Sequence, residues 1–275
     1  MINTYICDII FIGDYMIRLI LKEDIEILNK KYNLDLSYLE SLLNNMTEYM
    51  YISINNEIEG YMICLDDGNS INIKEVIGNK DDFLKHLLFN SNKDIYSDIF
   101  IDGFEKVGNK FIKRFERFKV NNIDIIEYYE QDDEFKNKLL NQINEPLWNG
   151  ARFLYNKIIK NELVNGKVYI VYDKDRDHII SFASLSDDDE IVDTDLKPWI
   201  GCVYTFRPYR GNRYSQILIN HILDKAKENK INYVYLSSDH QGLYEKYGFK
   251  KIGMMKRTEG YETQVYSIKL DNNKM

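Results

Sequence analysis

One stretch of the sequence, residues 199–249, most constrains the fold. Residues 200–206 form an apolar run that is typical of a buried strand, and residues 214–229 carry apolar side chains at helical spacing. A turn with one Pro and one Gly joins them, and residues 233–236 predict a second strand. A strand, a tight turn, a helix and a strand form a βαβ unit, so we expect the two strands to be parallel neighbours in one sheet.

The turn at residues 210–215 opens a helix directly after a strand. The first backbone N–H groups of a helix lack internal partners, and this end of the helix dipole is positive. Such a site favours a phosphate or diphosphate group. By itself the turn is a weak signal, because a glycine between a strand and a helix usually marks only a turn.

Together, these elements resemble the GNAT superfamily of acyl-CoA-dependent N-acyltransferases. That family has Arg/Gln-x-x-Gly-x-Gly/Ala at the turn, and a segment like Leu-Tyr-Glu-Lys-x-Gly-Phe a few dozen residues later. The second motif is complete here at residues 243–249. The first motif departs from the pattern, because Arg213 stands where the family usually has Gly and Ser215 where it has Gly or Ala. A side chain at position 213 fits if its φ is negative, and Ser215 is small enough for a phosphate to approach.

The resemblance implies a cofactor site on the central strand and the turn. The backbone of Val203, Tyr204 and Thr205 would pair with the pantetheine arm of acyl-CoA along a splayed strand, although an ordinary buried strand would have the same sequence. Ser237 would contribute from the end of the second strand. N–H groups of the turn would hold the diphosphate, and the side chain of Arg213 either adds charge there or is solvated. The turn residues of this predicted site are Arg210, Gly211, Asn212, Arg213, Tyr214 and Ser215.

Tyr244 matches the family tyrosine that lies near the CoA sulfur and can protonate the departing thiolate. A phenol with an ordinary pKa of about 10 holds its proton at neutral pH and can give it to a stronger base. The alternative is a packed aromatic side chain in a chain that contains 22 tyrosines.

The attacking amine must lose a proton, and two residues after the second strand are candidate bases. Asp239 and His240 lie next to the expected thioester, and an unperturbed histidine titrates in a suitable range. Ser238 or Asp239 could equally cap the short helix that follows. Some GNAT enzymes use ordered water instead of a side chain, so the base remains open.

Charge and cysteine content narrow the classes of function. The net charge of −8 argues against a broad nucleic-acid surface and is compatible with a cationic amine substrate. The acidic run at residues 187–190 could attract such an amine or form a solvated loop. The three cysteines show neither zinc spacing nor a disulfide framework, which favours a reducing compartment, the cytoplasm. Cys202 has apolar neighbours and is expected in the core.

Several features are not found in the sequence. No His/Asp/Glu cluster has the spacing of metal ligands, so we expect no metal cofactor. We find neither a signal peptide nor a run of about 18 apolar residues, so we expect no membrane partner.

The length of 275 residues suits one large domain or two modest ones. In the first half we expect two strands, two helices, a hairpin at Asn55-Asn56, a strand, a helix, a strand and a final helix. The second half repeats this order, which indicates an internal duplication. We therefore expect an α/β fold of mixed sheets in two tandem GNAT-like halves, residues 1–120 and 121–275. The expected segments of the first half are residues 5–12, 15–21, 24–31, 36–45, 50–54, 58–65, 71–77, 83–89, 95–101 and 107–118.

The first half differs where the cofactor should bind. Asp81 and Asp82 begin its helix after the central strand, where Asp is a good cap but would repel a diphosphate. This half also lacks the Tyr-Glu-Lys-x-Gly-Phe segment. We expect it to bind no acyl-CoA and to serve packing or substrate selection.

The resemblance therefore predicts an N-acetyltransferase that moves an acetyl group from acetyl-CoA to a primary amine of a small molecule or peptide by direct attack. We expect a monomer or homodimer that binds no nucleic acid. The alternatives are a non-catalytic acyl-CoA-binding or regulatory module, which would bind CoA without thiol release, and a structural protein, which would not bind it. The acceptor and the acyl chain length remain open.

Overall fold

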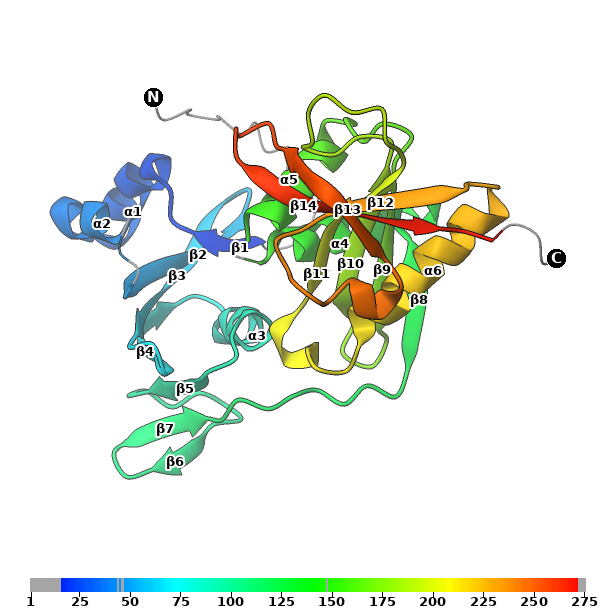
Figure 1. The fold of residues 1–275 in the computed structure, drawn as a ribbon. Helices are drawn as coiled ribbons and strands as arrows, with labels where there is room; N and C mark the ends of the chain where they lie inside the picture. Colours follow the sequence, from blue (N-terminus) through cyan, green and yellow to red (C-terminus); the bar gives the residue numbers. More distant parts are fainter. Residues whose placement is uncertain (1–15, 44, 46, 147, 272–275) are drawn as a thin grey trace. The chain divides into compact units, whose positions relative to one another are not determined.

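The structure, a computed structural model, describes residues 16–43, 45, 47–146 and 148–271 (Figure 1). The chain divides into two compact units, Met1–Glu116 and Arg117–Met275, and each contains a seven-stranded sheet. The strand predicted at residues 5–12, with Cys7, lies outside the described residues.

The first unit carries two helices after its first strand and a third helix between its fourth and fifth strands. In chain order its elements are β1 Met16–Leu19, α1 Ile25–Tyr32, α2 Leu36–Leu42, β2 Glu48–Asn55, β3 Glu57–Asp66, β4 Ser70–Ile77, α3 Lys80–Asn90, β5 Asp94–Ser97, β6 Glu105–Val107 and β7 Lys110–Lys113.

The second unit has its helices at the same points in its strand order, two after the first strand and one between the fourth and fifth strands. Its elements are β8 Ile123–Glu127, α4 Asp133–Asn144, α5 Asn149–Ile159, β9 Lys167–Asp173, β10 His178–Ser186, β11 Trp199–Thr205, α6 Tyr214–Glu228, β12 Tyr233–Ser237, the short helix η4 Glu245–Tyr247, β13 Lys250–Lys256 and β14 Glu262–Lys269.

The two sheets have one topology. Their strand orders are β1-β2-β3-β4-β5-β7-β6 and β8-β9-β10-β11-β12-β14-β13. In each sheet the fourth and fifth strands are parallel, as expected when a helix connects them, and the other described pairs are antiparallel. The predicted α/β class is confirmed, and the two halves share one architecture.

The helix predicted at residues 107–118 is wrong, because the chain forms a hairpin there. Val107 of β6 pairs with Lys110 of β7, which leaves Gly108 and Asn109 as a two-residue turn. Such turns need positive φ, and Gly108 supplies it with φ +63°. The correction makes the halves more alike, because the hairpin of β13 and β14 holds the same place in the second unit.

Alternating side chains of β2 explain how the first sheet is covered on both faces. Met50, Ile52 and Ile54 are buried in one cluster with residues of α1 and α2. Tyr51 points to the other face and is clustered with Phe83 of α3. Successive side chains of a strand point to opposite faces, so one strand supplies two cores.

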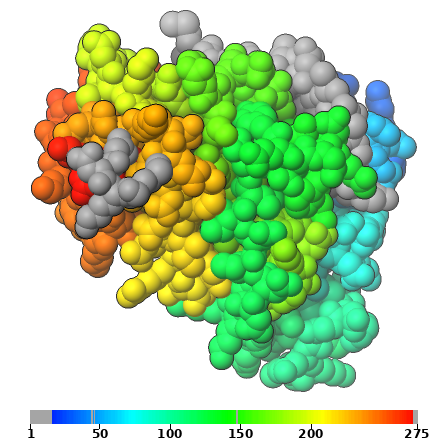
Figure 2. Space-filling model, turned by 90° about the vertical axis from the view of Figure 1, so that its right-hand side faces the viewer, coloured from blue at the N-terminus to red at the C-terminus, as the bar shows by residue number. Residues whose placement is uncertain are grey.

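The central strand of the second sheet is buried along its whole length. Every residue of β10 is buried, and the strand contacts α6 and α4. Strands that are covered on both faces read as nearly continuous apolar runs, as residues 179–185 do. In the space-filling view the yellow surface of α6 lies beside the green surface around β8 (Figure 2). Among the described helices, none has the length and apolar character to cross a membrane.

Candidate active site

Strands β11 and β12 meet at one point and then separate. Their register within the described residues consists of the pair Trp199 and Tyr235, next to a 3.0 Å hydrogen bond from Tyr235 N to Pro198 O. In the first unit β4 and β5 pair at four positions, from Ser70 with Asp94 onward. Parallel neighbours normally bond along their length. The rest of β11 therefore faces a gap, which is the splay that the family resemblance implies.

A β-bulge deforms β11 where it borders this gap. Gly201 pairs with Ser184 and Tyr204 with Phe182, so Cys202 and Val203 together oppose one residue of β10. Cys202 has φ +52°, and a bulge of this kind re-aims the side chains and amides around it. The expectation that Cys202 is a core residue is wrong, because it is only partly buried and lines a cavity.

The thiol of Cys202 stays protonated at neutral pH. Burial, together with the carboxylates of Asp189 and Glu190, raises the pKa of Cys202 to about 12. A thiol in that state is a poor nucleophile. The geometry therefore gives no support to an acyl-cysteine intermediate.

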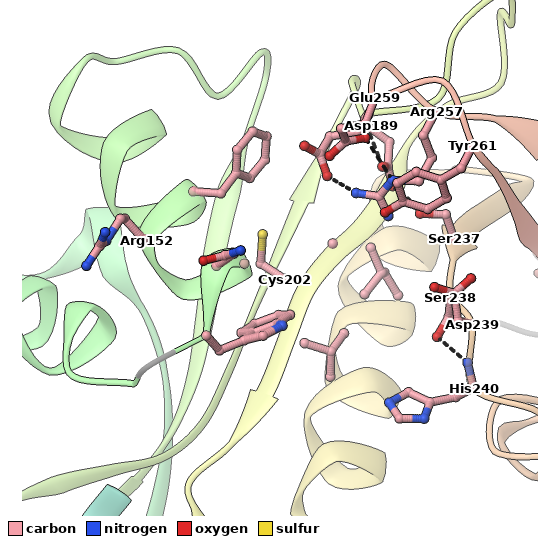
Figure 3. Close-up of a pocket in the computed structure, with 18 of the residues that line it drawn as sticks. Arg152, Asp189, Cys202, Ser237, Ser238, Asp239, His240, Arg257, Glu259 and Tyr261 are labelled. Atoms are coloured by element: carbon pink, nitrogen blue, oxygen red, sulfur yellow. Dashed lines mark hydrogen bonds and ion pairs between the residues drawn. The ribbon is translucent and has the colours of Figure 1, made fainter. Parts of the chain in front are cut away.

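The gap opens into a cavity of about 720 Å³ (Figure 3). This volume is in the range of small-molecule sites. Four parts of the second unit line it: the start of α5, the acidic loop before β11, the diverging strand ends, and the turn between β13 and β14. The lining includes Trp148, Arg152, Phe153, Asp189, Glu190, Gly201, Cys202, Val203, Ser237, Ser238, Asp239, His240, Tyr244, Arg257, Glu259 and Tyr261.

Sequence reasoning missed the contributions of α5 and of the β13–β14 turn to this cavity. Trp148 is 39% exposed, and its ring stacks on Tyr204 at 5.5 Å. Arg257 pairs with Glu190 and donates to Glu259 over 3.3 Å, and it lies 5.4 Å from the Tyr261 ring. No local pattern marks these residues, because they reach the cavity from elements distant in the chain.

The turn before α6 holds two residues with positive φ. Gly211 has φ +86° and Arg213 has φ +61°. The condition for an unstrained side chain at position 213, a negative φ, is therefore not met. A non-glycine residue in the left-handed region costs about 1–2 kcal/mol, which explains why the family usually has Gly at this position.

The start of α6 has unpaired backbone amides. Gln216 N and Ile217 N both donate to Arg213 O, at 3.0 and 3.1 Å. Among the described residues the amides of Tyr214 and Ser215 have no hydrogen-bond acceptor, and the first turn contains no acidic side chain. This end of the helix is therefore open to an anion.

Cationic side chains surround the same turn. Arg210 Nε donates to Thr205 O over 2.9 Å, and its guanidinium lies 5.3 Å from the Tyr204 ring. Arg117 Nη1 lies against Gly211, 2.5 Å from the position that a Cβ would occupy there. Arg117 is outside the motif, and sequence reasoning missed it. Asn212 is held within the turn, because its Nδ2 donates to Tyr209 O over 3.1 Å.

The three predicted residues of the central strand have different surroundings. Val203 lines the cavity, whereas Tyr204 and Thr205 do not. The Tyr204 carbonyl accepts from Ser181 Oγ at 2.6 Å, and the Thr205 carbonyl accepts from Arg210. Pairing of these residues with pantetheine stays a prediction, and Val203 is the best placed for it.

Tyr244 lines the cavity and is 7% exposed. Burial raises the pKa of Tyr244 to about 12, and the Ser238 hydroxyl partly opposes this shift. Tyr247, three residues later, connects the motif to the start of α6, because its hydroxyl lies 3.0 Å from Ser215 Oγ. The segment 243–249 therefore borders both the cavity and the helix start.

The loop after β12 brings Ser237, Asp239 and His240 to one wall of the cavity. Asp239 Oδ1 accepts a hydrogen bond of 2.8 Å from Thr263 Oγ1, and His240 N donates to Ser238 Oγ over 3.1 Å. Both Asp239 and His240 are exposed. Figure 3 shows His240 at the opposite end of this wall from Glu259. The role of either residue as a base stays a prediction.

One family model matches the second unit, and several solved structures are similar to it. Residues 127–249 match the Acetyltransferase (GNAT) family. An acetyltransferase from Streptococcus agalactiae is 18% identical over 54% of this chain and 98% of its own, with a TM-score of 0.40. A GNAT-family acetyltransferase from Staphylococcus aureus is 17% identical over 55% and 100%, with a TM-score of 0.37. An aminoglycoside 6′-N-acetyltransferase solved with coenzyme A is 15% identical over 53% and 96%, with a TM-score of 0.40.

A search of curated proteins found no match. The family match covers the strands, the turn and the Tyr-Glu-Lys-Tyr-Gly-Phe segment that border the cavity. The second unit is therefore similar to acetyltransferases of the GNAT family, with the family match at residues 127–249.

Proposed function

We propose that the second unit binds acetyl-CoA and transfers the acetyl group to a primary amine of a small molecule or peptide. One observation carries the proposal: β11 borders the cavity with residues 200–203 and leads, at its other end, into the open amides of α6. A cofactor with a diphosphate at one end and a thioester at the other matches this arrangement.

The diphosphate would bind the amides of Tyr214 and Ser215, with positive charge from Arg210, Arg213 and Arg117. The exposed arginines add modest attraction, and the amides add the directional part of the contact. The pantetheine arm would follow Val203 through the gap. The acetyl group would then lie beside Tyr244 in the cavity.

Tyr244 is the proposed donor to the leaving sulfur. Its pKa of about 12 lies above that of an ordinary thiol, about 8.5, so full transfer of the phenol proton to sulfur would cost roughly 5 kcal/mol. We therefore propose that the phenol donates a hydrogen bond to the developing thiolate. The proton reaches sulfur as the amine nitrogen gives up its own proton.

The acceptor side of the cavity favours a cation. Asp189, Glu190 and Glu259 contribute carboxylates, and Trp148 and Tyr261 contribute aromatic rings. Carboxylates and ring faces both attract an ammonium group. Since Cys202 is protonated, direct attack by the amine is the simpler route.

A thiol-release assay with acetyl-CoA tests the function. We expect release of CoA to depend on at least one amine in a panel of an aminoglycoside, spermidine, lysine and a peptide with a free N-terminus. The control is acetyl-CoA with the protein and no amine. Binding of acetyl-CoA without release for any amine would favour a non-catalytic module, and lack of binding would favour a structural protein.

We also propose that residues 1–120 are a degenerate copy that does not bind acetyl-CoA, and that residues 121–275 form the transferase domain. Strands β4 and β5 pair at four positions, whereas β11 and β12 pair at one. At the start of α3, Asn79 Oδ1 caps Asp81 N at 3.1 Å, and Asp81 and Asp82 add negative charge.

Calorimetry on the whole chain checks this proposal. We expect one acetyl-CoA per chain, because the first turn of α6 carries no carboxylate, whereas Asp81 and Asp82 stand at the start of α3, its counterpart in the first unit. Two equivalent sites per chain would contradict it.

A further inference from the structure

Two carboxylates of the cavity, Asp189 and Asp239, make no ion pair with the described residues, and Asp189 is the less exposed of the two. In the loop before β11, Glu190 pairs with Arg257, and Asp188 pairs with Lys157. Asp189 stands between them, and among the described residues it makes no ion pair. Its oxygens accept from Ser237 Oγ at 3.3 and 3.4 Å and from Glu190 N at 2.5 Å. Its charge is therefore available to a bound cation.

We propose that Asp189 binds the ammonium group of the acceptor and takes a proton from it before attack. This inference rests on the proposed function and assigns its proton acceptor. Asp189 borders both Ser237, the last residue of β12, and Cys202, in the bulge of β11. Its carboxylate therefore lies where the gap between the two strands opens into the cavity. Figure 3 shows Asp189 on the wall that also carries Arg257 and Ser237.

The surroundings of Asp189 suit a base. Burial raises the pKa of Asp189 above its ordinary value, although Arg257 and Lys157 oppose that shift. A carboxylate with a raised pKa is a stronger proton acceptor than a solvated one. The titratable or charged groups that face it are Glu190 on its own loop, Lys157 of α5, Cys202 of β11, and Arg257 and Glu259 of the β13–β14 turn.

Two protons leave the amine nitrogen during the transfer. Asp189 takes one proton from the ammonium, and the nitrogen lone pair forms the C–N bond while the carbonyl π pair moves to oxygen. That pair returns, and the C–S bond breaks with both electrons going to sulfur. A second proton leaves nitrogen and reaches the sulfur by way of the Tyr244 hydroxyl. The products are an amide and CoA thiol, and Asp189 later releases its proton to water.

The other candidate carboxylate is less suited to this step. Asp239 is exposed, and its Oδ1 already accepts from Thr263. His240 is exposed as well, at the far end of the wall. A solvated carboxylate attracts an ammonium group less strongly, because water and salt screen the attraction.

The variant Asp189→Asn tests the proposal, with the best amine of the panel as the probe. At pH 7 we expect kcat/KM to fall about 100-fold, as for loss of a general base. Affinity for acetyl-CoA should stay within twofold. The pH profile should change as well: without the base, the rate should rise about tenfold per pH unit up to the pKa of the amine, because only pre-formed free amine reacts. Asp189→Glu should keep more activity than Asp189→Asn.

The matched control is Asp187→Asn, two residues away in the same loop and outside the cavity lining. We expect it to keep wild-type kcat/KM. Thermal unfolding separates misfolding from lost chemistry: Asp189→Asn should melt no lower than the wild type, because removing a buried charge that burial disfavours relieves a cost. If the wild type is active and Asp189→Asn keeps kcat/KM within threefold with the same pH profile, the role of Asp189 is wrong and the proposed function stands. If the wild type releases no thiol with any amine, both fail.

Discussion

Replacing Ser215 by Asp is expected to weaken acetyl-CoA binding at least 100-fold while leaving the fold at least as stable as before. Ser215 is the second residue of α6, and Asp81 is the second residue of α3 in the other unit. The variant therefore places a carboxylate in the proposed diphosphate site at the position that Asp81 holds in the first unit. A carboxylate about 4 Å from a phosphate charge repels it by about 4 kcal/mol near a protein surface, which exceeds the 2.7 kcal/mol of a 100-fold loss.

The same carboxylate should stabilise the helix. Asp near a helix N-terminus contributes roughly 0.3–1 kcal/mol through the helix dipole. Calorimetric titration measures the affinity, and thermal unfolding measures the stability. The control is Ser215→Asn, which also loses the Ser215 hydroxyl contact with Tyr247 but adds no charge. Unchanged affinity in Ser215→Asp would show that the diphosphate does not bind at α6.

The variant Tyr244→Phe is expected to lower kcat about 100-fold at pH 7, the lower range for loss of an acid or base group. The phenyl ring keeps the packing of a side chain that is 7% exposed, so acetyl-CoA affinity should stay within twofold. Steady-state thiol release and titration measure the two quantities separately. Because the pKa of Tyr244 is raised to about 12, deprotonation of this phenol should cause no loss of wild-type activity up to about pH 10.

Tyr247→Phe is the matched control for that experiment. Its hydroxyl contacts Ser215 at the start of α6, so its loss should affect cofactor affinity more than kcat. A turnover of Tyr244→Phe within twofold of the wild type would remove Tyr244 from the mechanism.

Local patterns were sufficient to predict much of the architecture. The helical spacing after the turn corresponds to α6, and Asn55-Asn56 corresponds to the β2–β3 hairpin, where Asn56 has φ +61°. The parallel pairing of β11 and β12 also follows from chain order. These features depend on side-chain periodicity and on the φ preferences of single residues, both of which are local.

Backbone conformations that depend on their surroundings were not predictable in this way. Arg213 and Cys202 both have positive φ, although neither residue favours it. Cys202 takes that conformation in a bulge against β10, and Arg213 in the turn that starts α6. No sequence pattern predicts the positive φ of either residue. In each case the neighbouring elements fix the path of the chain and thereby the φ angle.

The sequence by itself determined the strand-turn-helix-strand order of residues 199–237, the turn at residues 210–215 and the segment that holds Tyr244. Only the tertiary structure decided which acid of the run 187–190 faces the cavity without a cation partner. Asp188, Asp189 and Glu190 are equivalent in the sequence. They differ in the fold because Lys157, Ser237 and Arg257, which lie 31, 48 and 67 residues from their respective partners, pair two of the acids with cations and leave Asp189 with a hydroxyl.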